Sequence, residues 1–475
     1  MTLPSTDDAA VRRSPRSGSA WLITVAIAIS MVGAAFLPSW TFTDPAVKSR
    51  KTTVSTVTLV CSTAPSAKRS SLTVVAQGAG KEAISITGYP RPSLRKVSGD
   101  QRFTIAMPKK VRFVALRVDP SAVDTAQATM TSRDTSRLSR GVASQVCAPA
   151  STQWWFAGAA GTLGRDDVLL LSNPESAAAM VNVDFVTDHG VMTPAPAQGI
   201  NVAPYGQRVI RLNSLIAGRA AAAVHVTTTG GRIHASVFAR ASSGRFSVGS
   251  EWLPATSPDA TVIPLPSDVG PAALIVAAPM DAASVKVVAL GANGQFSPAG
   301  LETFAIPAGH ARRVRMPDIA SNASALLISS STPVVAGYVA KVEMDSAQRI
   351  GDIVAAGAMK PMRSDQTIAA GGFPRGRTAV IAAGPRQAVS GMMTVSAGGR
   401  TDRVAFSVPA GSARRLQLPT TSSDAFIHAT PDKGSGPYTL YIATRANDGA
   451  QRDAASLTAT VRSTSVVLRA VVNVP

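Results

Sequence analysis

Arginines recur after proline turns at four places in the chain. The turns are at Pro108, Pro204, Pro307 and Pro409, and each precedes a segment in which basic and apolar residues alternate. The arginines of these segments are Arg112, Arg208, Arg312, Arg313, Arg315, Arg414 and Arg415. If the copies are similarly oriented, these arginines form a repeated basic stripe. Because a guanidinium group binds phosphate or carboxylate through paired hydrogen bonds, the stripe predicts binding of an anionic ligand. The alternative is that the charges keep exposed strand faces soluble.

The chain lacks the residue patterns of common catalytic sites. It contains no GxSxG, HExxH, phosphate-binding GK[ST] or DxDxDG pattern. Ser93 and Lys96 have the SxxK spacing of penicillin-recognising enzymes, but they follow a segment expected to be a loop, and neither SDN nor KTG follows. Asp166 and Asp167 precede a strand and are expected to form a turn. We therefore predict no enzyme activity, no catalytic residue and no cofactor.

Two histidines, His225 and His234, flank the Gly230-Gly231 pair. If these glycines form a two-residue hairpin turn, the two histidines become diagonal neighbours on one face of a sheet. A metal ion bound there would need a third ligand, which the sequence does not offer. We therefore predict ordinary strand residues and no metal site.

Tryptophans follow the closing strands of the first two expected repeats. Trp154 and Trp155 lie after the first, and Trp252 lies at the corresponding place after the second. Aromatic side chains at such positions are expected to pack between consecutive domains. The alternative is a stacking platform for sugars at an exposed edge.

The proline turns belong to an internal repeat of about 100 residues. Apolar segments that open each copy end in a proline, at 57–65, 168–174, 273–279 and 379–385, and similar strands close each copy. The expected repeats span residues 51–150, 151–256, 257–365 and 366–475. We predict a mostly β protein, a tandem array of immunoglobulin-like or fibronectin-like β-sandwiches, because about seven short strands per copy are typical of that architecture.

Strands of the second copy are expected near 168–172, 180–187, 198–202, 208–212, 223–228, 232–239 and 246–253. A short helical turn is expected within 213–223. Parallel α/β folds are disfavoured, because no long amphipathic helix separates the strands.

A single apolar segment, residues 21–40, has no charged residue and has the length of a membrane-spanning helix. Arg12, Arg13 and Arg16 precede it, which predicts a cytoplasmic tail over 1–20 and an extracytoplasmic remainder. We expect a single-pass signal anchor in the cell membrane. A cleaved signal peptide is the alternative, because Gly33-Ala34-Ala35 offers small residues for cleavage.

Composition supports a folded chain with an anionic partner. Of 475 residues, 45% are hydrophobic and 16% are charged, which excludes a disordered polyelectrolyte. The net charge of +19 favours an anionic surface. Nucleic acid is not expected as the partner, because the basic residues lie mainly in the part predicted to be outside the membrane.

The two cysteines, Cys61 and Cys147, follow the predicted membrane segment. We expect them to form a disulfide that ties together the two ends of the first repeat, because disulfides persist outside the cytosol. A reactive thiol pair or a metal site is the alternative, although there is no CxxC spacing and no nearby histidine.

These features together resemble the actinobacterial DUF5719 family of membrane-anchored envelope proteins. The resemblance rests on the N-terminal apolar segment, Ala/Arg-rich β repeats, a Cys in the first apolar strand, a second Cys before Trp154-Trp155-Phe156, and a strand ending at Asn173-Pro174. It implies an envelope protein of unassigned activity and supplies no catalytic residue.

The sequence therefore predicts a noncatalytic, membrane-anchored extracytoplasmic scaffold or binding protein. Its expected partners are envelope proteins or anionic cell-wall glycan. The alternative is an envelope enzyme, or an accessory subunit of a glycan-assembly enzyme, with an active site between domains.

Overall fold

The computed structural model describes residues 50–53, 56–65, 67, 69–76, 84–90, 94–97, 101–119, 126–136, 139–266, 269–319, 322–345, 350–362, 368–373, 377–397, 400–419, 425–448, 451–458 and 465–468. Two compact units are present. The larger is Thr53–Ser465, and the smaller combines Met1–Thr52 with Val466–Pro475. Among the described residues, none of the helices has the length and apolarity to cross a membrane. The predicted span, 21–40, lies outside the described residues.

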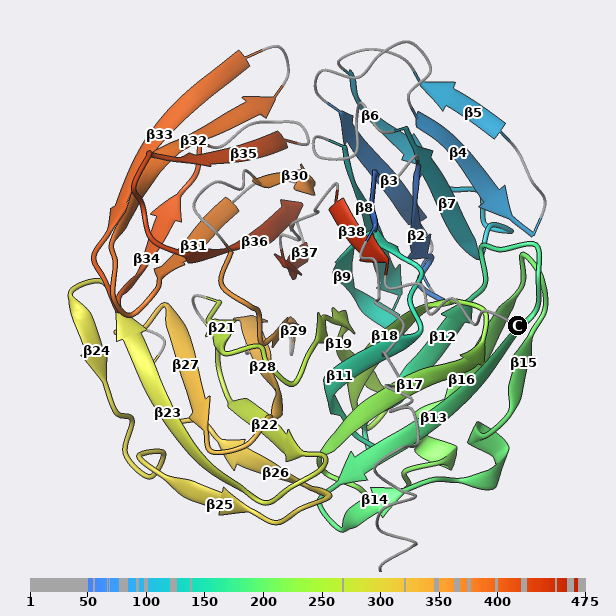
Figure 1. The fold of residues 1–475 in the computed structure, drawn as a ribbon, viewed down its shortest axis with the longest axis horizontal. Helices are drawn as coiled ribbons and strands as arrows, with labels where there is room; N and C mark the ends of the chain where they lie inside the picture. Colours follow the sequence, from blue (N-terminus) through green and yellow to red (C-terminus); the bar gives the residue numbers. More distant parts are fainter. Residues whose placement is uncertain are drawn as a thin grey trace, which may run out of the picture. The chain divides into compact units, whose positions relative to one another are not determined.

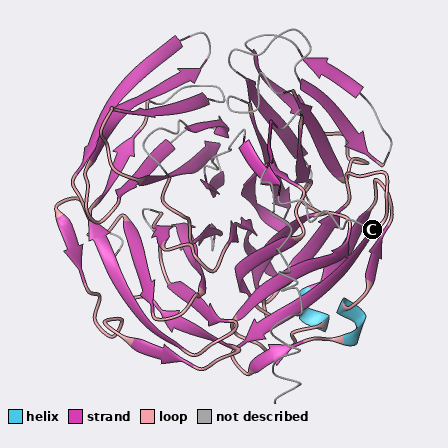
Figure 2. Cartoon of the chain, viewed as in Figure 1, coloured by secondary structure: helices cyan, strands magenta, loops and turns pink. Residues whose placement is uncertain are grey.

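The regular secondary structure of the described chain is almost entirely strand (Figure 2). The first repeat contains β2 (Val57–Ser62), β3 (Arg69–Ala76), β4 (Ile84–Tyr89), β5 (Leu94–Val97), β6 (Gln101–Ala106), β7 (Phe113–Val118), β8 (Gln127–Ser136), β9 (Ser139–Val146) and β10 (Ala148–Pro149). The second contains β11 (Gln153–Ala159), β12 (Val168–Ser172), β13 (Ala179–Thr187), β14 (Gly190–Met192), β15 (Ile200–Val202), β16 (Gln207–Arg211), β17 (Ala222–Gly230), β18 (His234–Ser243), β19 (Phe246–Leu253) and β20 (Ala255–Thr256), with helical turns η2 (Ala195–Ala197) and η3 (Leu212–Ser214).

The remaining strands repeat this order. The third repeat contains β21 (Val262–Pro264), β22 (Ala272–Ala278), β23 (Ala283–Gly291), β24 (Gly294–Phe296), β25 (Phe304–Ile306), β26 (His310–Arg315), β27 (Ala325–Ser330), β28 (Val335–Asp345) and β29 (Ile350–Gly357). The fourth contains β30 (Ile368–Phe373), β31 (Arg377–Ala383), β32 (Val389–Ala397), β33 (Arg400–Val408), β34 (Ala413–Gln417), β35 (Ala425–Pro431), β36 (Tyr438–Asp448) and β37 (Gln451–Thr458). Strands β1 (Arg50–Thr53) and β38 (Ser465–Leu468) pair with each other.

Each repeat folds into two antiparallel sheets. The first sheets have the orders β10-β2-β7-β4-β5, β14-β13-β17-β11-β20, β21-β27-β23-β24 and β30-β35-β32-β33. The second sheets have the orders β6-β3-β8-β9, β16-β12-β18-β19, β26-β22-β28-β29 and β34-β31-β36-β37. In the second repeat an apolar core with Phe185 of the first sheet and Leu169 of the second joins the two. The mostly β fold and its small antiparallel sheets are therefore as predicted.

The strands expected in the second repeat are confirmed to within two residues at most boundaries. The sheet to which each strand belongs was less predictable. Consecutive strands β11 and β12 lie in different sheets, whereas the first two strands of an immunoglobulin domain share one.

The alignment of the first repeat with the others is wrong by one strand. The strands after Pro204, Pro307 and Pro409 are β16, β26 and β34, which are edge strands of second sheets. The strand after Pro108 is β7, which lies inside a first sheet between β2 and β4. The pairing position of β16 is filled in the first repeat by β6 instead. A proline turn is a local signal, whereas pairing depends on distant residues.

Sheets of neighbouring repeats also pack face to face. Apolar clusters join the first sheet of one repeat to the second sheet of the next. Ala64 and Phe238 share one such cluster, Ala223 and Ile275 a second, and Val262 and Ala382 a third. Strand β30 of the last repeat contacts β3 and β8 of the first. The unit Thr53–Ser465 therefore closes on itself.

The last strand of each second sheet lies at the middle of this unit (Figure 1). There β9, β19, β29 and β37 contact one another in sequence, and β37 contacts β9 again. Their backbones approach closely. A Cβ atom on Gly141 of β9 would lie 2.7 Å from Oδ1 of Asp352 and 2.8 Å from the amide nitrogen of Ser250, so a side chain does not fit there.

Two fully buried carboxylates hold these central strands together. Asp352 of β29 accepts hydrogen bonds from the backbone amides of Val142 on β9 (3.2 Å) and Ser250 on β19 (3.1 Å). Glu251 of β19 accepts from the amide of Ser144 on β9 (3.1 Å). These strands are sheet edges, so the carboxylates satisfy amides that would otherwise be buried without a neighbouring strand.

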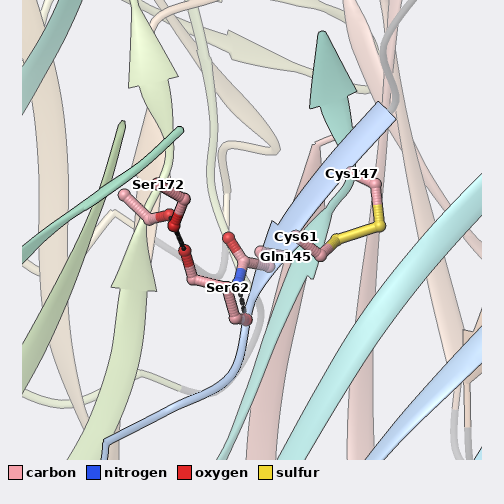
Figure 3. Close-up of a disulfide and its surroundings, with 6 residues drawn as sticks. Cys61, Ser62, Gln145, Cys147 and Ser172 are labelled. Atoms are coloured by element: carbon pink, nitrogen blue, oxygen red, sulfur yellow. Dashed lines mark hydrogen bonds between the residues drawn. A yellow bond between two sulfur atoms is a disulfide. The ribbon is translucent and has the colours of Figure 1, made fainter. Parts of the chain in front are cut away.

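The predicted disulfide between Cys61 and Cys147 is present, with the two Cα atoms 4.7 Å apart (Figure 3). It joins β2 to the segment between β9 and β10, and so links the two ends of the first repeat. Beside it, the hydroxyl of Ser62 lies within hydrogen-bonding distance of Ser172 (3.2 Å) and Ser236 (3.1 Å) in the second repeat. The disulfide therefore supports a contact between repeats as well as the first repeat itself.

Replacing Asp352 with Asn should lower the free energy of unfolding by about 3 kcal/mol, because a buried charged acceptor of several amides is lost. Urea unfolding of the variant measures this change. The control is Asp281→Asn, an exposed position where the loss should stay below about 0.5 kcal/mol. Equal effects of the two substitutions would contradict the role of Asp352.

Replacing both cysteines, Cys61→Ala with Cys147→Ala, should cost about 2–5 kcal/mol, because the bond closes a loop whose ends are 86 residues apart. Urea unfolding without reductant measures the loss. Reduced wild-type protein should match the double variant. A variant as stable as the oxidised protein would refute this contribution.

Candidate functional site: a cationic cavity between the second and third repeats

A cavity of about 390 Å³ lies where the second and third repeats meet. We call it the junction cavity. Its walls come from β11, β18 and β19 of the second repeat and from β22, β26, β28 and β29 of the third. Its lining residues are Gly158, Leu163, Gly164, Arg165, Ala220, Ala241, Ser242, Val248, Pro271, Ala272, Ala273, Ile275, Arg313, Arg315, Val339, Ala340, Lys341 and Ile353.

The register of the third repeat's second sheet explains which side chains face the cavity. Ala273 of β22 lies between Arg315 of β26 and Val339 of β28. Ile275, two residues along the same strand, lies opposite Arg313. Because residues two apart share a face, both arginines point toward the second repeat.

Close packing next to the cavity fixes the distance between the repeats. Gly337 of β28 lies against β11, where an added Cβ would be 2.5 Å from the carbonyl oxygen of Ala157. Trp155 and Ala223 of the second repeat share an apolar cluster with Ile275 and with alanines of the third. The cavity is therefore a gap beside a tight contact rather than a loose interface.

Four cationic side chains line the junction cavity: Arg165, Arg313, Arg315 and Lys341. Arg165 is already paired, since its Nη2 lies 2.7 Å from Oδ2 of the buried Asp167. Burial lowers the pKa of Arg313, and repulsion from the nearby guanidinium of Arg165 lowers it further. None of the described lining residues is acidic. Arg313, Arg315 and Lys341 therefore give the cavity a net positive charge.

The rest of the wall is aliphatic. Val248, Ile275, Val339 and Ile353 contribute branched side chains, and smaller apolar residues fill the space between them. Leu163 lies on the loop before Arg165 and is 105% exposed, so it reaches into solvent at the cavity.

The predicted arginine set does not form one stripe. Arg313 and Arg315 share the junction cavity, whereas Arg312 faces the opposite side of β26, with its Cζ 5.0 Å from the ring centroid of Phe304. Alternation along the strand separates these neighbours. Arg208 likewise turns to its own repeat, where its Nε donates to the carbonyl oxygen of Asn201 (3.0 Å).

The other predicted arginines lie at different junctions. Arg415 donates to the carbonyl oxygen of Leu265 (3.3 Å) and so joins the fourth repeat to the third. Arg414 is half-buried on β34, opposite Ile381. Arg112 is exposed before β7, at the contact between the first and second repeats.

The predicted tryptophans lie inside the protein. Trp155 is buried between the second and third repeats, and Trp252 is buried with Phe238 between the first and second. Trp154 is half-buried and donates from Nε1 to the carbonyl oxygen of Ile233 (3.0 Å). An exposed sugar-stacking surface would require rings free on one face, and the buried rings of Trp155 and Trp252 do not provide it.

His225 and His234 are not neighbours on one sheet, because the hairpin turn that this arrangement required is not formed. Strand β17, with His225, belongs to the first sheet, and β18, with His234, belongs to the second. The Gly230-Gly231 turn therefore crosses between sheets instead of closing a hairpin. His225 stacks on Trp155 at a centroid distance of 3.8 Å, and His234 lies edge-on to Trp154.

Two of the four cationic residues that line the junction cavity, Arg165 and Lys341, were not anticipated from the sequence. Arg165 precedes Asp166-Asp167, which was interpreted as a turn, yet Asp167 is fully buried and holds Arg165 in the cavity wall. Lys341 is the last residue of the closing strand expected at 332–341 in the third repeat, and nothing in the sequence distinguished it. The sequence shows Arg165 two residues before Asp167, but it does not show that Asp167 is buried.

The corresponding junction between the third and fourth repeats also has a cavity, of about 380 Å³. Its lining residues among those described are apolar, glycine, serine and threonine, without a charged side chain. The two cavities have similar volumes but differently charged linings. The cationic lining is therefore a property of the second junction and not of the repeated fold.

A smaller cavity of about 100 Å³ adjoins His234, Trp154 and Trp252. Neither ring nitrogen of the buried His234 has a hydrogen-bond partner in the described part of the chain. Burial lowers the pKa of His234 from 6.5 to about 3.

This shift predicts a pH-dependent stability. Between pH 6.5 and about 3 the unfolded chain protonates His234 and the folded chain does not, so stability falls by up to about 1.4 kcal/mol per pH unit as the pH drops. His234→Gln should flatten this slope, as measured by urea unfolding at several pH values. Parallel curves for wild type and variant would contradict it.

Comparison with known proteins identifies the family. A search of curated proteins finds no match. Residues 108–419 match DUF5719, a family of unknown function, and this region includes both walls of the junction cavity. The chain therefore belongs to the DUF5719 family.

Proposed function

We propose that this chain is a noncatalytic binding protein of the cell envelope and that it holds an anionic group in the junction cavity. The observation that carries the proposal is the placement of Arg313 and Arg315 on one face of β26, beside Arg165. Both arginines are exposed, and guanidinium groups that share one face bind phosphate or carboxylate through charge-assisted hydrogen bonds.

The proposed location is outside the cytoplasmic membrane, with a single anchor at 21–40 and a short cytoplasmic tail. The charge-free segment and the preceding arginines support the anchor. The disulfide between Cys61 and Cys147 supports an oxidising compartment.

The proposed partner is an anionic component of the envelope, either a cell-wall polymer or a molecule carried by other envelope proteins. A unit of β-sandwich repeats that closes on itself offers a rigid support for such a site. Rigid elements hold binding groups more accurately than loops do, and both arginines lie on a strand.

An envelope enzyme with an active site between repeats is the alternative. The junction cavity does not favour it, because its described lining residues include no carboxylate, imidazole or thiol. General acid-base or nucleophilic chemistry would need such groups near the bound ligand.

The test replaces Arg313 and Arg315 together with Ser and measures retention of the full chain on purified anionic cell-wall polymer at low salt. Loss of two charge-assisted contacts should reduce retention about tenfold or more. The matched control replaces Arg208 and Arg211 in the same way. They lie on β16, the strand of the second repeat equivalent to β26, so their replacement removes the same charge.

The control should change retention less than about twofold. Equal losses in both double variants would assign retention to total charge alone and remove the cavity from the account. Unchanged retention in the cavity variant would overturn the proposal.

A further inference from the structure

We propose that the ligand of the junction cavity is an amphiphilic anion, a phosphate or carboxylate group joined to a hydrocarbon chain. This inference rests on the proposed function and specifies its ligand class. The juxtaposition that carries it is a cationic edge strand beside an aliphatic floor within one cavity.

Most of the positive charge on the cavity face of the third repeat's second sheet lies on its outer strand. Its outer strand β26 presents Arg313 and Arg315. The next strands inward present Ile275 on β22, Val339 on β28 and Ile353 on β29. A molecule lying along the row Arg315, Ala273 and Val339 would therefore meet positive charge at its outer end and hydrocarbon further inward, while Lys341 adds a second positive charge on the next row, opposite Ile353.

The opposite wall, from the second repeat, has the same division. Arg165 lies close to Arg313, so the two guanidinium groups repel each other, and an anion between them would remove this repulsion. Val248 of β19 adds a further aliphatic group to the lining. The head group would thus be held by arginines from two repeats, and the chain would lie among aliphatic side chains of both.

The chemistry of the walls disfavours a sugar. Sugar hydroxyls need hydrogen-bond acceptors and commonly stack on aromatic rings. Among the described lining residues, Ser242 is the one side chain that carries a hydroxyl, and none is aromatic, amide or acidic. Arginine and lysine only donate, so they suit an anionic head group rather than a polyol.

The size of the cavity disfavours a bare inorganic anion. A volume of about 390 Å³ is within the range of sites for organic ligands. Inorganic phosphate would engage the arginines and leave the half-buried Val248 and Val339 in contact with water, so this apolar surface would add nothing to affinity. The fully exposed Leu163 extends this apolar surface to the cavity mouth.

The experiment measures binding of alkyl phosphates to the full chain in nonionic detergent by equilibrium filtration. Butyl phosphate and octyl phosphate are compared, together with inorganic phosphate, glucose 1-phosphate and octanol. Burial of the additional methylenes should make octyl phosphate bind at least about tenfold tighter than butyl phosphate. Octanoate in a parallel arm distinguishes a lipid phosphate from a fatty carboxylate as the source of the head group.

Two variants locate the effect. Arg313→Ser should weaken both alkyl phosphates by about tenfold. Val339→Thr keeps the shape and charge of the wall, so it should reduce the advantage of octyl over butyl phosphate by several-fold while leaving butyl phosphate nearly unchanged. The thermal unfolding midpoint of each variant checks that it is folded.

The outcomes separate this inference from the proposed function. Equal binding of butyl phosphate, octyl phosphate and glucose 1-phosphate, all weakened by Arg313→Ser, would overturn the amphiphile and retain the anion site. Octanol binding as tightly as octyl phosphate would also overturn it. If Arg313→Ser leaves the binding of every phosphate unchanged, or if no phosphate binds, both the amphiphilic ligand and the anion site are overturned.

Discussion

The structure depends on four sheet-edge strands that meet at the middle of the unit Thr53–Ser465. Such edges present backbone amides that need acceptors, and Ser144 of β9, Ser250 of β19 and Asp352 of β29 are buried where these strands and β37 contact one another. Asp352 and Glu251 supply acceptors from fully buried side chains, and glycine at Gly141 allows the backbones to approach. Satisfying these amides joins the repeats into one body.

Once the second sheets converge there, their faces must be covered by neighbouring repeats, and the residues at each junction determine its properties. The first junction packs Phe238, Trp252 and a serine contact beside the disulfide, and it keeps a smaller cavity of about 100 Å³ next to Trp252. The second and third junctions keep cavities of similar volume, and only the second is lined with cations. The proposed binding site is thus a local variation on a repeated architectural gap.

Sequence periodicity predicted the strands well, because alternation and proline turns are local signals. It predicted sheet membership poorly: the Gly230-Gly231 turn has the sequence of a hairpin turn, yet it links two sheets. The arginine set was recognised, but alternation along β26 sends Arg312 away from Arg313 and Arg315. Arg165 is held in place by a buried aspartate across a short loop, a relation that only the folded chain makes visible.

The most direct test of a single body built on the central strands is native-state hydrogen exchange of the full chain in low denaturant, followed by mass spectrometry. Peptides that cover β9, β19, β29 and β37 should open with one common free energy, and Asp352→Asn should lower that value in all four. Repeats that open at separate free energies, with the effect of Asp352→Asn confined to the third, would contradict the account.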